Sequence, residues 1–271
     1  MSNIFIHITA GIYLVSTLVF IGYLITHKES LGTIGRNVIF AGFVFHTMTI
    51  LSRWFEGGRF PATNLHESLT LLAWLTVVLY IVLFYKFRLT VLGAFLAPLA
   101  LFFVVVASLM PGEIVPLSPV LATYWLPIHV TLAVLGNAFF ALASLFGVMY
   151  LIQDHYLKSR KLGGLYFVLP SLDLLDELNY RCLSYGFPLL TLGIMTGAIW
   201  SEYAFGTYWM WKHRQVWSII TWLLYAILLH GRMTSGWRGR VSATFSVLAF
   251  GVLLCSSFII YFLLGEGHGL L

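Results

Sequence analysis

The stretch LTVLGAFLAPLALFFVVVASL, residues 89–109, contains no charged residue and decides the class of fold. A helix rises about 1.5 Å per residue, so about 20 mostly apolar residues cross the hydrocarbon core of a bilayer. Comparable stretches recur, and we place eight spans near residues 4–25, 34–51, 65–85, 89–109, 126–153, 183–199, 216–230 and 241–264. The sequence therefore predicts an all-α fold, a polytopic membrane helix bundle of about eight transmembrane helices. We expect residues 1–271 to form a single integral membrane domain.

The overall composition agrees with this interpretation. Apolar residues make up 60% of the 271 positions and charged residues only 9%, which is too little charge for the surface of a soluble protein of this size. The net charge of +5 does not indicate nucleic acid binding, because the basic residues stand in short segments between apolar spans. The two cysteines, Cys182 and Cys255, form no CxxCH motif, so we expect that the chain is not itself a c-type cytochrome.

The distribution of Lys and Arg predicts how the chain is oriented in the lipid bilayer. Eleven of the 15 basic residues fall in one set of alternate loops: Lys28, Arg36, Lys86, Arg88, Lys158, Arg160, Lys161, Arg181, Arg232, Arg238 and Arg240. The other set contains Arg53, Arg59, Lys212 and Arg214. The side richer in Lys and Arg is normally cytoplasmic. We therefore expect both termini to be extracytoplasmic, in a bacterial inner (cytoplasmic) membrane or its equivalent.

Four of the nine histidines lie at positions that need an explanation, and they indicate a function only when taken as two pairs at two depths. His46 lies inside the second span and His230 closes the seventh, where ionisable groups are costly and often functional. His129 opens the fifth span and His268 follows the eighth, both on the predicted outer side. Neutral imidazole is a common metal ligand and a usual axial ligand of haem iron. For any one of them alone, the competing interpretation is a hydrogen bond to a neighbouring helix or an interfacial position.

The other five histidines are interpreted as solvated or interfacial: His7, His27, His66, His155 and His213. In the first outer loop, Asn64 and Glu67 form a capping-box-like pattern at the start of the third span. On the cytoplasmic side, residues 173–178 predict a short amphipathic surface helix.

The outer segment of residues 200–217 is rich in aromatic side chains. Such a segment is typical of a membrane-interface belt, and it also suits a stacking platform for a flat ring system. Gly206 allows close approach of a ligand to the backbone. The cations of Lys212 and Arg214 can meet propionates or lipid phosphates. Composition alone favours the belt.

Taken together, several motifs resemble those of the cytochrome c assembly family, and specifically its CcsA (ResC) type, the haem-handling protein of system II. The matching positions are Arg53-Trp54, Pro61, Asn64, Glu67-Ser68, Leu126-Pro127-Ile128-His129, residues 217–226, Leu229-His230, Gly236-Trp237-Arg238-Gly239-Arg240 and Gly267-His268. They extend over nearly the whole chain after the first span. Each motif is weak alone, and the set is specific.

The resemblance implies transmembrane handling and delivery of haem b for covalent attachment to apocytochromes c. One histidine pair within the spans, matching His46 and His230, would ligate haem iron. A second pair on the outer face, matching His129 and His268, would hold haem for attachment. The aromatic loop would form the outer platform, with these binding residues: Gly206, Trp209, Trp211 and Trp217. The expected partners are a ResB (CcsB) type membrane protein and an apocytochrome whose CxxCH thiols attack the haem vinyl groups. The chain would then be a component of a system II haem lyase or synthetase, with no catalytic residue assigned.

The aromatic loop departs from the family motif W-G-x-x-W-x-W-D. Phe205 replaces the first Trp, Lys212 the Asp, His213 a following Pro and Gln215 a later acidic residue. This degeneracy keeps a second interpretation open, a HemX-like membrane regulator of tetrapyrrole synthesis. A third is a membrane electron-transfer subunit with two haems, each held by two histidines, which rests on the number of candidate ligands alone.

Overall fold

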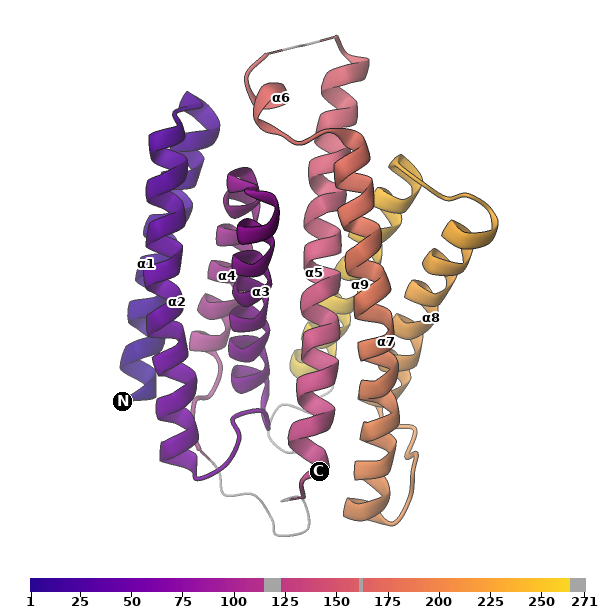
Figure 1. The fold of residues 1–271 in the computed structure, drawn as a ribbon. Helices are drawn as coiled ribbons and strands as arrows, with labels where there is room; N and C mark the ends of the chain where they lie inside the picture. Colours follow the sequence, from indigo (N-terminus) through magenta and orange to yellow (C-terminus); the bar gives the residue numbers. More distant parts are fainter. Residues whose placement is uncertain (115–122, 161–162, 264–271) are drawn as a thin grey trace. The chain divides into compact units, whose positions relative to one another are not determined.

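The computed structural model describes residues 1–114, 123–160 and 163–263, and within these ranges it contains α-helices and no strand (Figure 1). The helices are α1 (Ser2–Thr26), α2 (Glu29–Gly57), α3 (Leu65–Phe87), α4 (Thr90–Leu109), α5 (Trp125–Lys158), α6 (Leu165–Val168), α7 (Leu172–Phe205), α8 (His213–Thr234) and α9 (Arg240–Leu263). The all-α prediction is confirmed.

Eight of the described helices, all except the short α6, are long and apolar enough to cross a membrane. The eight predicted spans are therefore confirmed, although several helices extend beyond them. The largest difference is α7, which has 34 residues and is about 50 Å long. The prediction of a separate surface helix at residues 173–178 is wrong, because these residues form the first turns of α7. No Gly or Pro stands between Asp173 and Leu183 to end the helix there.

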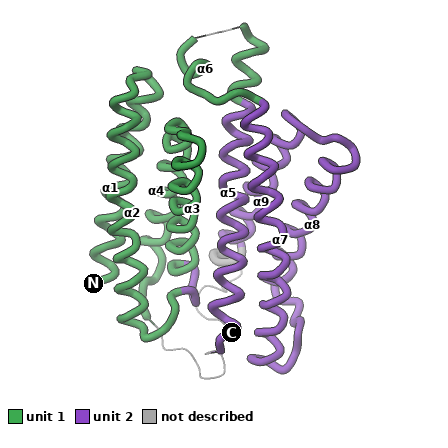
Figure 2. The backbone as a smooth tube through the Cα atoms, viewed as in Figure 1, with its two compact units in different colours: residues 1–61, 66–114, 152–172 green, residues 62–65, 115–151, 173–271 purple. Residues whose placement is uncertain are grey.

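The chain divides into two compact units, shown in green and purple in Figure 2. Unit 1 comprises residues 1–61, 66–114 and 152–172, and unit 2 comprises residues 62–65, 115–151 and 173–271. Within unit 1, α1 packs against both α2 and α4. Glycines on α2 admit aromatic rings of α1: a Cβ on Gly42 would lie 2.6 Å from Cε1 of Tyr13, and one on Gly35 would lie 3.1 Å from the ring of Phe20. Small residues of this kind allow membrane helices to approach closely.

Unit 2 uses the same device between α5 and α7. A Cβ on Gly136 would lie 2.9 Å from the backbone nitrogen of Leu190, and one on Gly193 would lie 3.0 Å from Cα of Ala133. The two backbones therefore run nearly in contact. Nearer the other end of α7, the buried amide of Asn179 donates to the carbonyl of Ala143 at 2.7 Å, which joins the same two helices by a polar contact. His46 lies beside the first of these close helix pairs, and His129 lies beside the second.

Candidate functional site

His46 lies on α2 in unit 1, and its imidazole is completely buried. Its Nδ1 forms a hydrogen bond of 3.1 Å with the hydroxyl of Tyr13 on α1, and the two rings meet edge to face with their centroids 5.7 Å apart. Its Nε2 is buried and has no hydrogen-bond partner among the described residues. A buried nitrogen without a partner is costly unless something else binds it. The lone pair of Nε2 in the neutral ring is what a metal requires.

His129 lies in the first turns of α5 in unit 2 and is half-buried. Its Nδ1 is 2.7 Å from the backbone carbonyl oxygen of Gly193 on α7. A carbonyl oxygen can only accept, so Nδ1 must carry the hydrogen, and Nε2 of the neutral ring then has the lone pair. His129 is therefore held in the tautomer of a metal ligand.

Two residues of α7 fix the plane of the His129 ring. The indole of Trp200 is parallel to it within 3°, with ring centroids 6.4 Å apart. A Cβ on Gly197 would lie 2.6 Å from Cε1 and 2.7 Å from Nδ1 of His129. Only glycine therefore leaves room for the imidazole at this position. Sequence reasoning missed Gly197, and it placed Trp200 in the aromatic segment of residues 200–217 without linking it to His129, because neither residue lies near His129 in the sequence.

The aromatic loop between α7 and α8 is built by its own contacts. Gly206 ends α7 with φ of +72°, and Trp211 also has a positive φ, of +55°. The rings of Trp209 and Trp211 meet edge to face at 6.0 Å, and Trp211 is 77% exposed. The Nε1 of Trp209 is a buried donor without a described partner. Trp217, on α8, is half-buried. The loop thus presents an exposed aromatic surface together with an unused donor.

The positions at which this loop departs from the family motif support one another. The ammonium of Lys212 lies 5.6 Å from the centroid of the Phe205 ring, close enough for a cation–π interaction. The side-chain oxygen of Gln215 accepts the backbone N–H of Met210 at 2.9 Å. Three of the altered residues therefore stabilise the loop that they occupy. The altered motif forms an ordered turn.

His230 is exposed near the end of α8 in unit 2, and the residues after it are firmly held. The guanidinium of Arg232 donates to both carboxylate oxygens of Asp176 on α7, at 2.8 and 2.6 Å. The backbone N–H of Gly239 also donates to this carboxylate, at 2.8 Å. Asp176 thus joins the start of α7 to the end of α8 and to the turn before α9. This turn positions the helix end that carries His230.

The four candidate ligands are not all brought together by the described residues. His46 belongs to unit 1 and His230 to unit 2, so their pairing stays a prediction. His268 lies outside the described residues, so its pairing with His129 also stays a prediction. Within the described ranges, no three His, Cys, Asp or Glu side chains gather as a metal site would require. A haem iron needs no such group, because the porphyrin supplies four ligands and one or two imidazoles complete the set.

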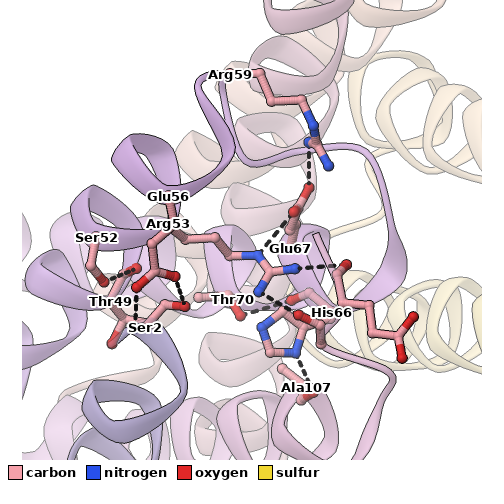
Figure 3. A network of polar contacts seen from close by, with 12 residues as sticks. Ser2, Thr49, Ser52, Arg53, Glu56, Arg59, His66, Glu67, Thr70 and Ala107 are labelled. Atoms are coloured by element: carbon pink, nitrogen blue, oxygen red, sulfur yellow. Dashed lines mark hydrogen bonds and ion pairs between the residues drawn. The ribbon is translucent and has the colours of Figure 1, made fainter. Parts of the chain in front are cut away.

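A buried polar network in unit 1 was not predicted (Figure 3). Glu67 lies between two guanidiniums, with Arg53 Nε at 2.9 Å and Arg59 Nη1 at 3.1 Å, and its side chain is 1% exposed. Arg53 also donates to the carbonyl of Gly112 at 3.0 Å. A capping role alone therefore does not account for Glu67, and Arg53 is a residue of α2, not of a loop. The network fixes the turn between α2 and α3 to the segment after α4.

The prediction for His66 is wrong, because this side chain is 3% exposed and its Nδ1 bonds the carbonyl oxygen of Ala107 at 2.7 Å. Burial within unit 1 replaces the expected interfacial position, since the first turn of α3 packs beside the end of α4. The other four histidines of that group are exposed, as predicted: His7, His27, His155 and His213.

Comparison with known proteins gives consistent matches. The sequence profile of the family described as "Cytochrome C assembly protein" matches residues 62–267. A protein of Guillardia theta named "Cytochrome c biogenesis protein CcsA" is 37% identical over 244 residues, which cover 80% of this chain and 81% of the relative. A protein of the same name from Synechococcus sp. (strain JA-3-3Ab) is 34% identical over 278 residues, covering 82% and 79%.

Among solved structures, the chain is similar to "Cytochrome c Heme Lyase CcmF", with a TM-score of 0.73. The match covers 95% of this chain and 46% of that chain, so the present chain spans less than half the length of the solved one. The sequence identity is 18%, and the likeness therefore shows the fold alone.

Proposed function

The chain belongs to the cytochrome c assembly protein family, and from this premise we propose that it holds haem at two depths of a membrane for attachment to apocytochromes c. It is a multi-pass membrane protein with a role in cytochrome c biogenesis. That role entails the handling of haem and of apocytochrome c.

One observation carries the proposal: the two histidines matched to haem ligands in separate units, His46 and His129, each use Nδ1 in a hydrogen bond to a neighbouring helix. Nε2 of His46 is buried without a hydrogen-bond partner among the described residues. Histidines that ligate metals usually hold the other ring nitrogen in a hydrogen bond that orients the ring. His66 shares this geometry through its bond to Ala107, so the match of His46 and His129 to the family's ligand positions is what separates them from a structural histidine.

The proposed sites follow the two depths predicted from the sequence. His46 with His230 would ligate the iron of haem within the membrane, and His129 with His268 would do so at the extracytoplasmic side. The exposed aromatic surface of the loop would support the outer ring, with Trp209 and Trp211 stacking on it, Gly206 and Trp217 shaping its edge, and the cations of the loop near the propionates. This arrangement requires both termini to be extracytoplasmic, in a bacterial inner membrane or its equivalent.

The haem, which we propose is haem b, supplies two vinyl groups to which the thiols of an apocytochrome CxxCH motif add. The residues of this chain bind and orient. The imidazoles would hold the iron, and the ring of Trp200, which is parallel to that of His129, orients this imidazole. Bringing reactants together in this way accelerates a reaction without any protein acid or base. A ResB (CcsB) type membrane protein is the proposed partner that presents the apocytochrome.

The alternative of a regulator of tetrapyrrole synthesis receives no support from the relatives described above, which are named for cytochrome c biogenesis. A deletion strain separates the two functions. We expect it to lose covalently bound c-type cytochromes, measured by haem staining of membranes after denaturing electrophoresis, while haem-precursor levels stay normal. Restoring the gene should restore the cytochromes. Normal c-type cytochromes together with altered precursor levels would refute the assembly role.

A further inference from the structure

We propose that Tyr13 is a positioning residue for His46, whose phenol oxygen accepts the hydrogen of Nδ1 and so turns Nε2 toward haem iron. This inference rests on the proposed function, and it adds a residue of α1 to the intramembrane site. The hydroxyl of Tyr13 lies 3.1 Å from Nδ1 of His46, and both side chains are 0% exposed. Burial shields both groups from bulk solvent.

The position of the phenol is set by the close pairing of α1 and α2. Gly42 stands one turn before His46 on the same face of α2, and the Tyr13 ring occupies the space that a Cβ of Gly42 would need. Three residues after Tyr13 on α1, the hydroxyl of Ser16 donates to the backbone carbonyl of Gly35 on α2 at 2.9 Å. This hydrogen bond joins the two helices. The phenol therefore meets the imidazole from a fixed direction.

The neighbouring hydroxyls do not compete for His46. Thr17 donates to the backbone carbonyl of Tyr13 at 2.8 Å, and Thr49 donates to that of Phe45 at 3.0 Å. Thr9 in the same way donates to the carbonyl of Phe5 at 2.8 Å. Each is satisfied within its own helix, so the hydroxyl that meets the imidazole is that of Tyr13, while the backbone of Thr70 on α3 also lies against His46.

A phenol can donate or accept, and this determines what the contact does. If Tyr13 donates to Nδ1, the ring hydrogen of His46 is on Nε2 and the nitrogen cannot bind iron. If Tyr13 accepts from Nδ1, Nε2 carries a lone pair and can bind iron. Binding of haem therefore selects the second arrangement, in which the hydrogen bond also raises the basicity of the ligand. The same pair accommodates His46 with and without iron.

The test is Tyr13→Phe in the full-length chain, purified in detergent and titrated with ferric haem. A His129→Ala background isolates the intramembrane site. We expect the affinity for haem to fall about 10- to 100-fold, as for other residues that orient metal-bound histidines. We also expect the reduction potential of the remaining haem to rise, because an imidazole without an acceptor at Nδ1 donates less charge to ferric iron. Loss of packing alone would not move the potential in a set direction.

The matched control is Tyr80→Phe in the same background. Tyr80 is likewise 0% exposed in unit 1, but its hydroxyl has no described hydrogen-bond partner. We therefore expect the affinity of this variant for haem to stay within twofold of the parent and the reduction potential to stay the same. A second variant, Gly42→Ala, keeps the hydroxyl of Tyr13 but displaces its ring. We expect the affinity of this variant for haem to fall as well. Gly11→Ala is its control, because a Cβ there has nothing within 4 Å.

The outcomes separate this inference from the proposed function. If His46→Ala lowers the affinity while Tyr13→Phe binds haem within twofold of the parent at the same potential, the role of Tyr13 is refuted and the ligand role of His46 stands. If His46→Ala itself binds haem as the parent does, the intramembrane site fails. If Tyr13→Phe does not fold, the Gly42→Ala and Gly11→Ala pair decides, and equal affinity of those two overturns the inference.

Discussion

His46 in unit 1 and His129 in unit 2 are held alike at Nδ1 but by partners of different chemistry. The partner of His46 is a phenol, and the partner of His129 is a backbone carbonyl. The carbonyl can only accept, so it fixes His129 in the form that offers a lone pair at Nε2. The phenol permits both forms of His46. On the proposed function, the outer imidazole would be preset for iron, whereas the inner one would adopt its ligand form when iron binds.

The two histidines also share a way of being placed. Each lies beside a helix pair in which glycines let the neighbouring helix approach: Gly42 for Tyr13 and His46, and Gly193 and Gly197 for His129. The difference is in what the glycine admits. Gly42 admits the ring of the partner, whereas Gly197 admits the imidazole itself. A substitution of Gly42 should therefore displace the ring of Tyr13, whereas a substitution of Gly197 should displace the imidazole of His129.

The largest expected effect is a loss of stability in unit 1 that leaves the site at His129 in unit 2 unchanged. Glu67→Gln leaves the guanidiniums of Arg53 and Arg59 without their carboxylate, and Arg53 is 2% exposed. We expect the free energy of unfolding in detergent to fall by about 3 kcal/mol, because an ion stays buried without its counter-charge. The spectrum of haem at His129 should be unchanged in the folded fraction.

Glu177→Gln is the control for that loss. Glu177 pairs with Arg181 one turn along α7, and both side chains are well exposed. We expect a change of about 0.5 kcal/mol or less. Equal losses for Glu67→Gln and Glu177→Gln would mean that the buried network does not stabilise unit 1.

A smaller effect sharpens the comparison at the outer histidine. Gly197→Ala places a Cβ 2.6 Å from Cε1 of His129 and must shift the ring from its carbonyl partner. We expect the affinity for outer haem to fall about 10-fold, the lower end of what displaced orienting contacts cost. Titration of the purified variant with haem measures this loss, in a His46→Ala background that isolates the outer site.

Gly251→Ala on α9 serves as the matched control, because a Cβ there meets nothing within 4 Å. We expect it to bind haem as the parent does. An outer affinity of Gly197→Ala equal to that of Gly251→Ala would show that the orientation of His129 does not matter for binding.

The sequence was sufficient for the bundle, because hydrophobic stretches of about 20 residues have no other common use. It located α4 within one residue at its start and at the same residue at its end. It was wrong for residues 173–178, because their polar face suggested a separate surface helix, whereas the backbone continues without a break into α7. A continuous run of helix-forming residues from Asp173 to Leu183 was the signal available.

The four histidines could be singled out from the sequence, but their partners could not. Tyr13 is 33 residues from His46, and Gly193 is 64 residues from His129. Hydropathy gives no register between two helices, so it cannot say which side chains meet. One signal was present for the inner site, since Tyr13 and Phe20 are seven residues apart on one helix and Gly35 and Gly42 are seven apart on the next. Rings facing glycines at matched spacing indicate the register.

Glu67 and Arg53 show a different limit. Each is polar beside an apolar span, and interpretation by position alone assigns one to a helix cap and the other to a loop. In the folded chain both side chains are buried instead, because two opposite charges that flank a short turn can be buried together when they form an ion pair. Their pairing is a property of the folded turn, which neither residue reveals alone.

The central claim is that imidazoles in the two units hold two separate haems. The most direct measurement is the haem content and visible spectrum of the purified chain, compared with the double variants His129→Ala with His268→Ala and His46→Ala with His230→Ala. We predict a spectrum of iron bound by two histidines in the parent, loss of the outer haem alone in the first double variant, and loss of the intramembrane haem alone in the second. Unchanged haem content and spectrum in both double variants would contradict the account.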